Sequence, residues 1–431
     1  MLVRAAVSTV RRMGLPAHGA EPNDVLTRLE AFRAGDLRWK EGRAFSLTYY
    51  AGHEAHELGL EAYARFSSEN ALNTDAFPSL KRMQTEVIGT VCELLGGDEQ
   101  SVGVFTSGGT ESILTAVKGA REWGRSKGIT NPTMVLPTTA HAAFSKASKY
   151  FGVTAVRVPV RADYRADTDA MAAAITPDTV LVVGSAPAYP QGVIDPIPEI
   201  AALASAFDVL CHVDACMGFT LPWLTRLGLV DRAWNFAVPG VTSISCDLHK
   251  FGYTAKGASV LAHRSKQLRK HQFFVTDDWL GGLYGSSAIL GTRSGGSLAA
   301  AWAVMQHIGE DGYLRLTKSA YESRVRIERG LAAIPGLAIR GAPETTLVAF
   351  GADPSLPAVD QVDIYAVGDR LWSEKGWYCD RQTPPDSLHC TVNAVHEHVV
   401  DEFVADVAVA VAAQQADRTR SGDRTRAYGT V

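Results

Sequence analysis

The sequence contains little cysteine. Only six cysteines occur in 431 residues, and no two of them form a C-x-x-C pair. This pattern excludes a zinc ribbon, a thioredoxin-type redox motif and a small scaffold held together by disulfides. We therefore expect reduced and mostly buried thiols.

Long apolar runs and a strong net charge are also missing. No apolar run approaches the ~18 residues that cross a bilayer, and no N-x-[ST] sequon free of proline occurs. Lys and Arg number 42 and Asp and Glu number 46, so the formal net charge of -4 provides no long-range attraction for nucleic acid. We expect a cytoplasmic protein with no transmembrane segment, and an N-terminal helix or irregular arm over residues 1–13 rather than a targeting peptide.

Apolar periodicity from residue 79 onward predicts an α/β fold. A helical face holds Leu80, Met83, Val87, Val91 and Leu94, and Gly96 and Gly97 follow it. Further helices are predicted over 111–123 and 198–207. Short β-branched runs predict strands over 134–136, 155–160, 179–183, 209–213, 243–245 and 259–262. Strands that are apolar on both faces and joined by helices predict a mainly parallel sheet flanked by helices.

The same reading divides the chain into four parts. Residues 1–78 form an N-terminal segment, and residues 79–319 form a large ligand-binding domain. Residues 320–413 contain a strand over 346–350 and a helix over 399–413, which predicts a smaller C-terminal α+β domain. Residues 414–431 are charged and poor in large apolar side chains, so we expect a disordered tail.

Polar motifs matter most at the carboxyl ends of the strands, where such sheets bind ligands. The segment Thr106–Ser112 (TSGGTES) carries Gly108, Gly109 and Thr110 at the start of a predicted helix. Two glycines allow close approach of the backbone, and the helix N-terminus directs N–H groups at an anion. The motif predicts a phosphate-binding turn, although a glycine turn that caps an ordinary helix has the same letters.

Asp214 follows the predicted strand 209–213, with the small residue Ala215 beside it. A carboxylate at this edge can pair with a protonated pyridine nitrogen and keep the ring electron-withdrawing. The alternative is that Asp214 caps the next helix.

Lys250 follows the strand 243–245 and precedes a glycine turn. A lysine that traps an aldehyde must lose its proton, and a dry pocket beside a cation lowers its pKa. Lys250 is therefore the candidate Schiff-base lysine, with a solvated loop lysine as the alternative.

His141 follows the strand 134–136, where an imidazole can stack on a cofactor ring opposite Ala215. A histidine near a helix start is the competing interpretation. In chain order the four motifs supply a phosphate turn, a stacking ring, a carboxylate for a ring nitrogen and an amine. Together they predict pyridoxal 5'-phosphate as the cofactor, with Lys250, Asp214 and His141 as catalytic residues.

On these motifs the chain resembles the fold-type I pyridoxal-phosphate enzymes of the group II decarboxylase superfamily, and within it the sphingosine-1-phosphate lyase family. The likeness covers about residues 43–392. It is carried by the stretches 70–86, 106–112, 184–197, 212–216, 240–259 and 291–296.

The resemblance implies a homodimer with shared active sites and a retro-aldol cleavage of a phosphorylated amino alcohol into an aldehyde and phosphoethanolamine. The residues implied to meet the cofactor phosphate are Gly109, Thr110 and His249, with Gly291 and Thr292 from the partner chain.

The resemblance also implies substrate-binding residues. Tyr50, Tyr189 and Lys256 match the family positions that bind the substrate phosphate, but Asn73 replaces a histidine. A neutral amide cannot supply the charge-assisted hydrogen bond of an imidazolium, so the head group is open. A lipid substrate is expected to approach through aromatic positions: Phe45, Phe273, Phe274 and Trp279.

Two other functions remain open at this stage. One is an amino-acid decarboxylase on the same scaffold, and the other is a binding protein that has lost the chemistry. No metal site is expected, because His53 and His56 lack the i, i+4 spacing of zinc-protease helices.

Overall fold

The computed structural model describes residues 14–419 and 421–424. The chain divides into two units, residues 1–38 and 39–431. The described part of the first unit holds α1 (Pro22–Phe32), which has a proline in its first turn. The predictions for residues 1–13 lie outside the described residues. All candidate site residues belong to the second unit.

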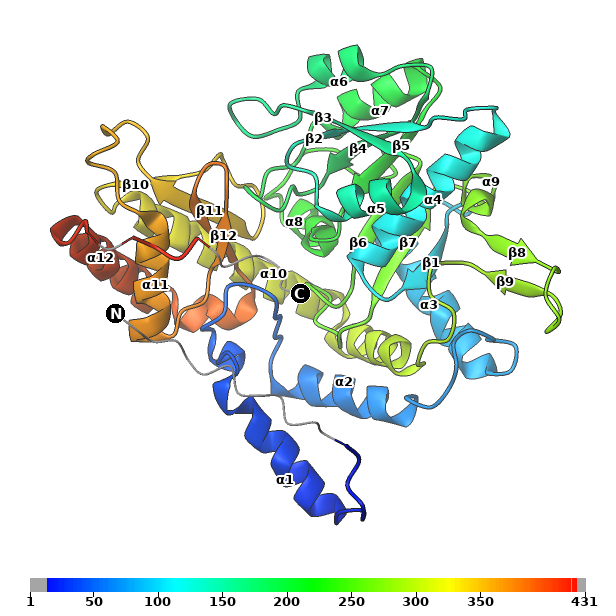
Figure 1. The fold of residues 1–431 in the computed structure, drawn as a ribbon, viewed down its shortest axis with the longest axis horizontal. Helices are drawn as coiled ribbons and strands as arrows, with labels where there is room; N and C mark the ends of the chain where they lie inside the picture. Colours follow the sequence, from blue (N-terminus) through cyan, green and yellow to red (C-terminus); the bar gives the residue numbers. More distant parts are fainter. Residues whose placement is uncertain (1–13, 420, 425–431) are drawn as a thin grey trace. The chain divides into compact units, whose positions relative to one another are not determined.

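A seven-stranded sheet forms the centre of the large part of the second unit (Figure 1). Its spatial order is β1-β7-β6-β5-β4-β2-β3. The strands are β1 (Val102–Thr106), β2 (Thr133–Pro137), β3 (Thr154–Val158), β4 (Thr179–Ser185), β5 (Leu210–Asp214), β6 (Ser243–Asp247) and β7 (Ser259–His263). Only β7 runs antiparallel to its neighbours β1 and β6 in this sheet. The mainly parallel sheet is confirmed, but the prediction omits β1.

Helices cover both faces of this sheet because its strands are apolar on both sides. Val135 of β2 belongs to one buried cluster, and its neighbours Met134 and Leu136 belong to another. The helices of this part are α2 (His53–Arg65), α3 (Pro78–Leu94), α4 (Gly109–Ser126), α5 (Ala143–Phe151), α6 (Thr168–Ala174), α7 (Ile197–Ala206), α8 (Leu221–Arg226) and α9 (Lys266–Arg269). Side chains of α4 and α5 pack in the second cluster, whereas those of α7 pack in the first.

A smaller antiparallel sheet has the order β10-β11-β13-β12. Its strands are β10 (Leu337–Ile339), β11 (Leu347–Ala352), β12 (Asp380–Gln382) and β13 (Ser387–Thr391), and its helices are α11 (Ile364–Lys375) and α12 (Val400–Ala416). Its core includes the fully buried Phe350 and Trp377. The predicted strand 346–350 corresponds to β11 and the predicted helix 399–413 to α12.

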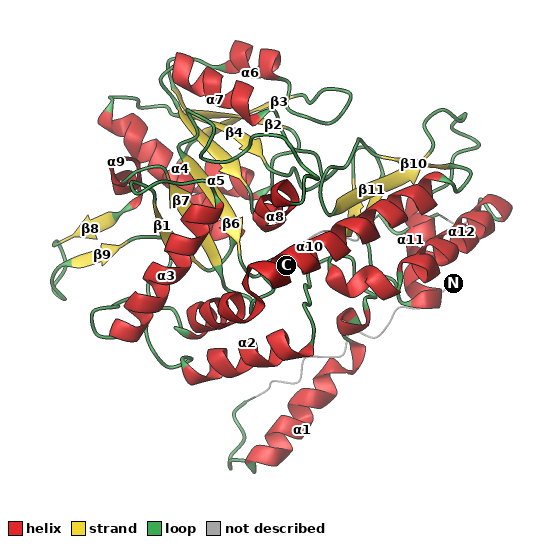
Figure 2. Cartoon of the chain, turned by 180° about the vertical axis from the view of Figure 1, so that it is seen from behind, coloured by secondary structure: helices red, strands yellow, loops and turns green. Residues whose placement is uncertain are grey.

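One long helix connects the two sheets. Figure 2 shows α10 (Gly296–Ala332) extending from the seven-stranded sheet to the four-stranded one. The helix is interrupted at Gly309, whose φ of 59° lies in the left-handed region. The predicted start of the smaller domain at residue 320 lies inside α10, and the predicted start of the tail at residue 414 lies inside α12.

A hairpin of β8 (Phe274–Thr276) and β9 (Tyr284–Ser286) extends away from the large sheet (Figure 1). Phe274 is 53% exposed and Trp279 is 61% exposed, whereas Phe45 is fully buried. Phe45 packs on Trp377, His396 and Phe403, so the expectation that it meets a lipid is wrong. Among the described residues, none of the helices combines the length and the apolar character that a membrane span requires.

Candidate functional site

A cavity of about 330 Å³ lies where β1 and β6 end. Its lining residues are Ser107, Gly108, Gly109, Thr110, Glu111, His141, Cys216, Asp247, His249 and Lys250. The fold thus brings together six of the predicted cofactor residues, which come from three separate segments of the chain.

The glycine turn at the start of α4 forms one wall of the cavity. A Cβ atom on Gly109 would lie 2.6 Å from Cys216 Sγ and 2.7 Å from Asp247 Oδ2, so only glycine fits there. Glu111 holds the turn in place, because its two carboxylate oxygens accept from Ser107 N at 2.7 Å and Leu290 N at 2.8 Å. The first N–H groups of α4 lack intrahelical partners and are available to an anion.

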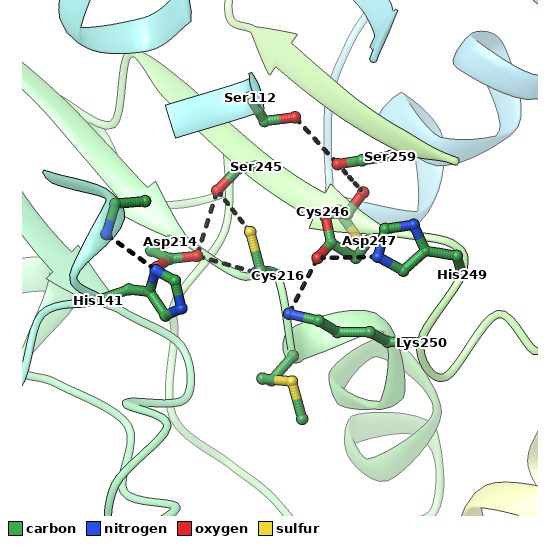
Figure 3. Close-up of polar contacts among 12 residues, drawn as sticks. Ser112, His141, Asp214, Cys216, Ser245, Cys246, Asp247, His249, Lys250 and Ser259 are labelled. Carbon is green, nitrogen blue, oxygen red and sulfur yellow. Dashed lines mark hydrogen bonds and ion pairs between the residues drawn. The ribbon is translucent and has the colours of Figure 1, made fainter. Parts of the chain in front are cut away.

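Lys250 lies on the connection between β6 and β7, which spans residues 248–258. Its Nζ is 2.9 Å from Oδ2 of Asp247, whose side chain is only 1% exposed (Figure 3). Burial alone would raise the pKa of Asp247, but the charge of Lys250 outweighs it and holds the pKa below its ordinary value. Asp247 is absent from the predicted site, although it stands three residues before Lys250.

Two histidines of the cavity are held as neutral rings. Burial lowers the pKa of His249 to about 4, with further lowering by Lys256 and Lys250. Burial also lowers the pKa of His141, which Asp214 opposes. Nδ1 of His141 accepts from Ala143 N at 3.1 Å, so the proton of the neutral ring lies on Nε2.

Asp214 ends β5 on the side of the cavity where His141 lies (Figure 3). Its Oδ1 accepts from Cys216 N at 3.1 Å and from Ser245 Oγ at 3.3 Å. These bonds fix the carboxylate at the sheet edge, and it does not cap the following helical turn, which lacks a side-chain cap. Ala215 beside it is fully buried.

The residues present fit pyridoxal phosphate. The cavity combines an anion-binding helix start, an amine and an imidazole, and the fixed carboxylate of Asp214 lies beside its His141. One buried oxygen, Asp247 Oδ1, has no hydrogen-bond partner among the described residues. A polar ligand in this cavity would satisfy that oxygen.

The predicted substrate residues are not all in one place. Tyr50 stacks edge-on against Trp39, with ring centroids 5.7 Å apart, and it lines a separate cavity with Arg315 and Lys318. Tyr49, the residue before Tyr50, lies closer to the connection between β6 and β7, which carries Lys250 and Lys256. Its ring centroid is 4.9 Å from Lys256 Nζ, and its hydroxyl donates to Met217 Sδ at 3.6 Å.

Lys256 connects this region to the cofactor cavity. Its Nζ donates to the carbonyl of His249 at 3.3 Å. Although part of its side chain is exposed, burial of the ammonium lowers the pKa of Lys256 to about 8, with Lys250 adding to the effect. Lys256 and Tyr49 together line a cavity of about 230 Å³.

Tyr189 and Asn73 have different partners. The hydroxyl of Tyr189 donates to Asp380 Oδ2 at 2.5 Å. Asn73 is exposed, and its Oδ1 accepts from Asp75 N at 3.1 Å and Ala76 N at 3.3 Å, which closes a turn before α3.

Gly291 and Thr292 do not line the cofactor cavity of their own chain. They belong to a loop near the start of α10, where Thr292 Oγ1 accepts from Asn70 Nδ2 at 3.4 Å. Within the described residues, no group of three or more His, Cys, Asp or Glu side chains is arranged for a metal ion.

Comparisons with known proteins agree with this geometry. Residues 71–224 match the family model for class-V aminotransferases. A sphingosine-1-phosphate lyase of Oryza sativa is 41% identical, and the match covers 97% of this chain and 78% of that protein. Sphingosine-1-phosphate lyase 1 of Rattus norvegicus is 40% identical over 91% of this chain and 68% of its own.

Solved structures give the same result. A sphingosine-1-phosphate lyase of Burkholderia pseudomallei superposes with a TM-score of 0.89 at 38% identity, covering 97% of this chain and 96% of that one. A glutamate decarboxylase of Lactobacillus brevis superposes with a TM-score of 0.82 at 18% identity, over 94% and 96% of the two chains, a likeness in fold.

Proposed function

The chain belongs to the sphingosine-1-phosphate lyase family, and on that premise we propose that it cleaves a phosphorylated amino alcohol into an aldehyde and phosphoethanolamine. It is a pyridoxal-phosphate-dependent aldehyde-lyase. The observation that carries the proposal is the Lys250 ammonium, held 2.9 Å from the buried Asp247 in a cavity bounded by the α4 glycine turn.

The chain supplies binding and orientation at this site. When bound, pyridoxal phosphate accepts the electron pair left on Cα as the neighbouring bond breaks. The N-terminus of α4 and His249 bind its phosphate. Lys250 would hold the cofactor through its amine, which Asp247 keeps in place. Asp214 would accept a hydrogen bond from the protonated ring nitrogen, and the neutral His141 would offer a flat face for stacking.

We assign the substrate head group to the cavity of Lys256 and Tyr49. With a pKa of about 8, Lys256 is mainly cationic at pH 7 and attracts a phosphate. Tyr49 lies against the same ammonium. In this proposal Asn73 and Tyr50 do not contact the head group, whereas the family resemblance implies that residues at their positions bind it.

We also propose a homodimer with shared active sites and a cytoplasmic location. The β8–β9 hairpin and its turn expose apolar side chains, with Leu280 and Leu283 the most exposed, and such a patch favours a protein interface. In the proposed dimer, Gly291 and Thr292 of each chain reach the cofactor cavity of the other chain, since they do not line the cavity of their own chain. Light scattering of the purified protein tests the dimer.

The proposed reaction is tested with purified holoenzyme and sphingosine 1-phosphate. We expect one aldehyde and one phosphoethanolamine per substrate, detected by mass spectrometry. Release of CO₂ from amino acids, without any aldehyde, would instead identify an amino-acid decarboxylase.

A further inference from the structure

A carboxylate from the smaller sheet lies behind Tyr189. Asp380 is the first residue of β12 and is 2% exposed. Its Oδ2 accepts two hydroxyl groups, from Tyr189 at 2.5 Å and from Ser46. Tyr189 belongs to the segment that follows β4, and Ala186 at the start of this segment donates its N–H to the carbonyl of Asp214 at 2.9 Å. Asp380 therefore reaches the active-site edge of the large sheet through Tyr189.

No cation neutralises this carboxylate among the residues that the structure describes. Burial raises the pKa of Asp380, and the hydroxyls of Ser46, Tyr189 and Tyr378 lower it by less. His389 lies opposite Asp380 on β13, and burial lowers the pKa of this histidine to about 3, so its ring is neutral. Arg381 next to Asp380 pairs with Asp369 instead, at 2.6 Å. The burial of Cys390, also on β13, raises its pKa and keeps the thiol uncharged.

The hydrogen bond determines what Tyr189 can do. A phenol has one proton, and a distance of 2.5 Å is typical of an O–H group donating to a carboxylate. With that proton directed at Asp380, the Tyr189 oxygen has only lone pairs to offer to a substrate. Such an oxygen accepts a hydrogen bond from a hydroxyl, but it cannot donate one to a phosphate. This differs from the phosphate-binding role that the family resemblance implies for Tyr189.

We propose that Asp380 is a positioning residue that makes Tyr189 the base for the substrate's C3 hydroxyl. The inference rests on the proposed function. The C3 O–H bond breaks and its proton passes to the Tyr189 oxygen, while the Tyr189 proton passes to Asp380. The electron pair left on the C3 oxygen forms the C=O bond of the aldehyde as the Cα–C3 bond breaks, and the electrons of that bond stay on Cα. Tyr189 then gives the proton taken from the C3 hydroxyl to Cα, which completes the amine product, and Asp380 returns its proton to Tyr189, so both side chains are restored.

The first test replaces Asp380 with asparagine. The amide of Asp380→Asn can still accept the Tyr189 hydrogen bond but cannot take its proton. We expect kcat to fall about 10²-fold while KM changes less than about threefold, as for the loss of a general base. The matched control is Asp406→Asn, because Asp406 is also a largely buried carboxylate of the smaller part and accepts from Trp377 Nε1 at 2.8 Å. The control should keep its kcat.

The second test measures kcat/KM as a function of pH and uses a variant that removes a single hydrogen bond. The base works when Asp380 is ionised, so kcat/KM should fall as the pH drops through the pKa of Asp380. Ser46→Ala removes a hydrogen bond that lowers this pKa, so this acidic limb should move to higher pH. The limb should be absent in Asp380→Asn.

The third test measures binding rather than turnover. Sphingosine 1-phosphate and its 3-deoxy analogue differ only in the C3 hydroxyl, and the wild-type protein should bind the analogue more weakly. In Tyr189→Phe this difference in Kd should disappear. The proposal is overturned if Asp380→Asn keeps full kcat, if Ser46→Ala leaves the acidic limb in place, or if Tyr189→Phe still discriminates the analogue. A wild-type protein that releases no aldehyde would instead remove the proposed function.

Discussion

At the scale of single residues, burial decides which titratable groups can act. Asp247 and Lys250 form a buried ion pair, and breaking such a pair by removing one partner leaves an uncompensated charge. The pair therefore keeps the Lys250 amine in place beside Asp247. Lys256, with a pKa of about 8, is mainly cationic at pH 7.

Replacing the amine at position 250 should abolish covalent attachment of the cofactor. We expect Lys250→Ala to show no turnover and no cofactor adduct after borohydride reduction, measured by mass spectrometry of the intact protein. Lys256→Gln is the matched control, because it removes a neighbouring ammonium and should keep the adduct while KM rises. An adduct that persists in Lys250→Ala would place the attachment at another amine.

Two adjacent tyrosines give a second prediction at this scale. Tyr49 faces Lys256, whereas Tyr50 packs on Trp39. We expect Tyr49→Phe to raise KM about tenfold, equivalent to the loss of one hydrogen bond to a charged group, and Tyr50→Phe to leave KM nearly unchanged. Steady-state kinetics with sphingosine 1-phosphate measures both. If Tyr50→Phe raised KM and Tyr49→Phe did not, the phosphate head group would instead bind at Tyr50.

The sequence motifs singled out for the site are local, and the structure places each near the end of a strand. Asp214 is the last residue of β5, Lys250 stands three residues after β6, and the glycine turn follows β1, a strand that the prediction omitted. Asp247 escaped notice because a carboxylate near a lysine is usually a solvated pair. Asp380 could not be predicted, because it meets Tyr189 from 191 positions away and only the packing of the two sheets joins them.

At the scale of elements, the start of α4 requires glycine at position 109, because a side chain would not fit there. Gly109→Ala would place a Cβ atom 2.6 Å from Cys216 Sγ, closer than real contacts allow. We expect the cofactor Kd to rise about 5- to 150-fold, as overpacking of about 1–3 kcal/mol implies. Gly89→Ala in α3 is the control, since nothing lies within 4 Å of its Cβ position. Equal cofactor affinities of the two variants, measured by equilibrium dialysis, would contradict this role of the turn.

Strand periodicity predicted the parallel core but not the edge of the sheet. β1 is a five-residue strand with Gly103 at its second position, and glycine weakens any strand pattern. The antiparallel direction of β7 also lacks a local signal, because it arises from the connection between β6 and β7, which turns back beside β6. This turn pairs Asp247 with Ser259 and holds the connection that carries Lys250 at the edge of the sheet.

At the scale of the whole molecule, the second unit joins two cores through α10 and through the Tyr189–Asp380 hydrogen bond. Apolar periodicity predicted an α/β chain, yet the contact between its two sheets depends on residues far apart in sequence. The histidines buried in these cores link stability to pH throughout the fold. Burial lowers the pKa of His212 and His396 to about 4, and that of His263 and His389 to about 3.

These histidines predict that acid destabilises the protein well above the pH at which most carboxylates titrate. Between about pH 6.5 and 4 the unfolded chain binds protons that the folded chain does not, so stability falls as the pH falls, by up to about 1.4 kcal/mol per pH unit for each histidine. Asp195 and Asp380 oppose the trend, because burial raises the pKa of both, to about 6 for Asp195, and the folded state then binds these protons first. His249, whose pKa is also lowered to about 4, adds to the effect of the four core histidines, so the urea midpoint should decrease from pH 7 to pH 5. In His263→Gln, the new amide can still donate to Gln272 Oε1, but it does not titrate. The slope of stability against pH should therefore be smaller in this variant, by the equivalent of about one bound proton. The control is His398→Gln, at an exposed position, which should retain the full slope. A midpoint that stays constant or rises toward pH 5 would mean that the buried rings are protonated in the folded state.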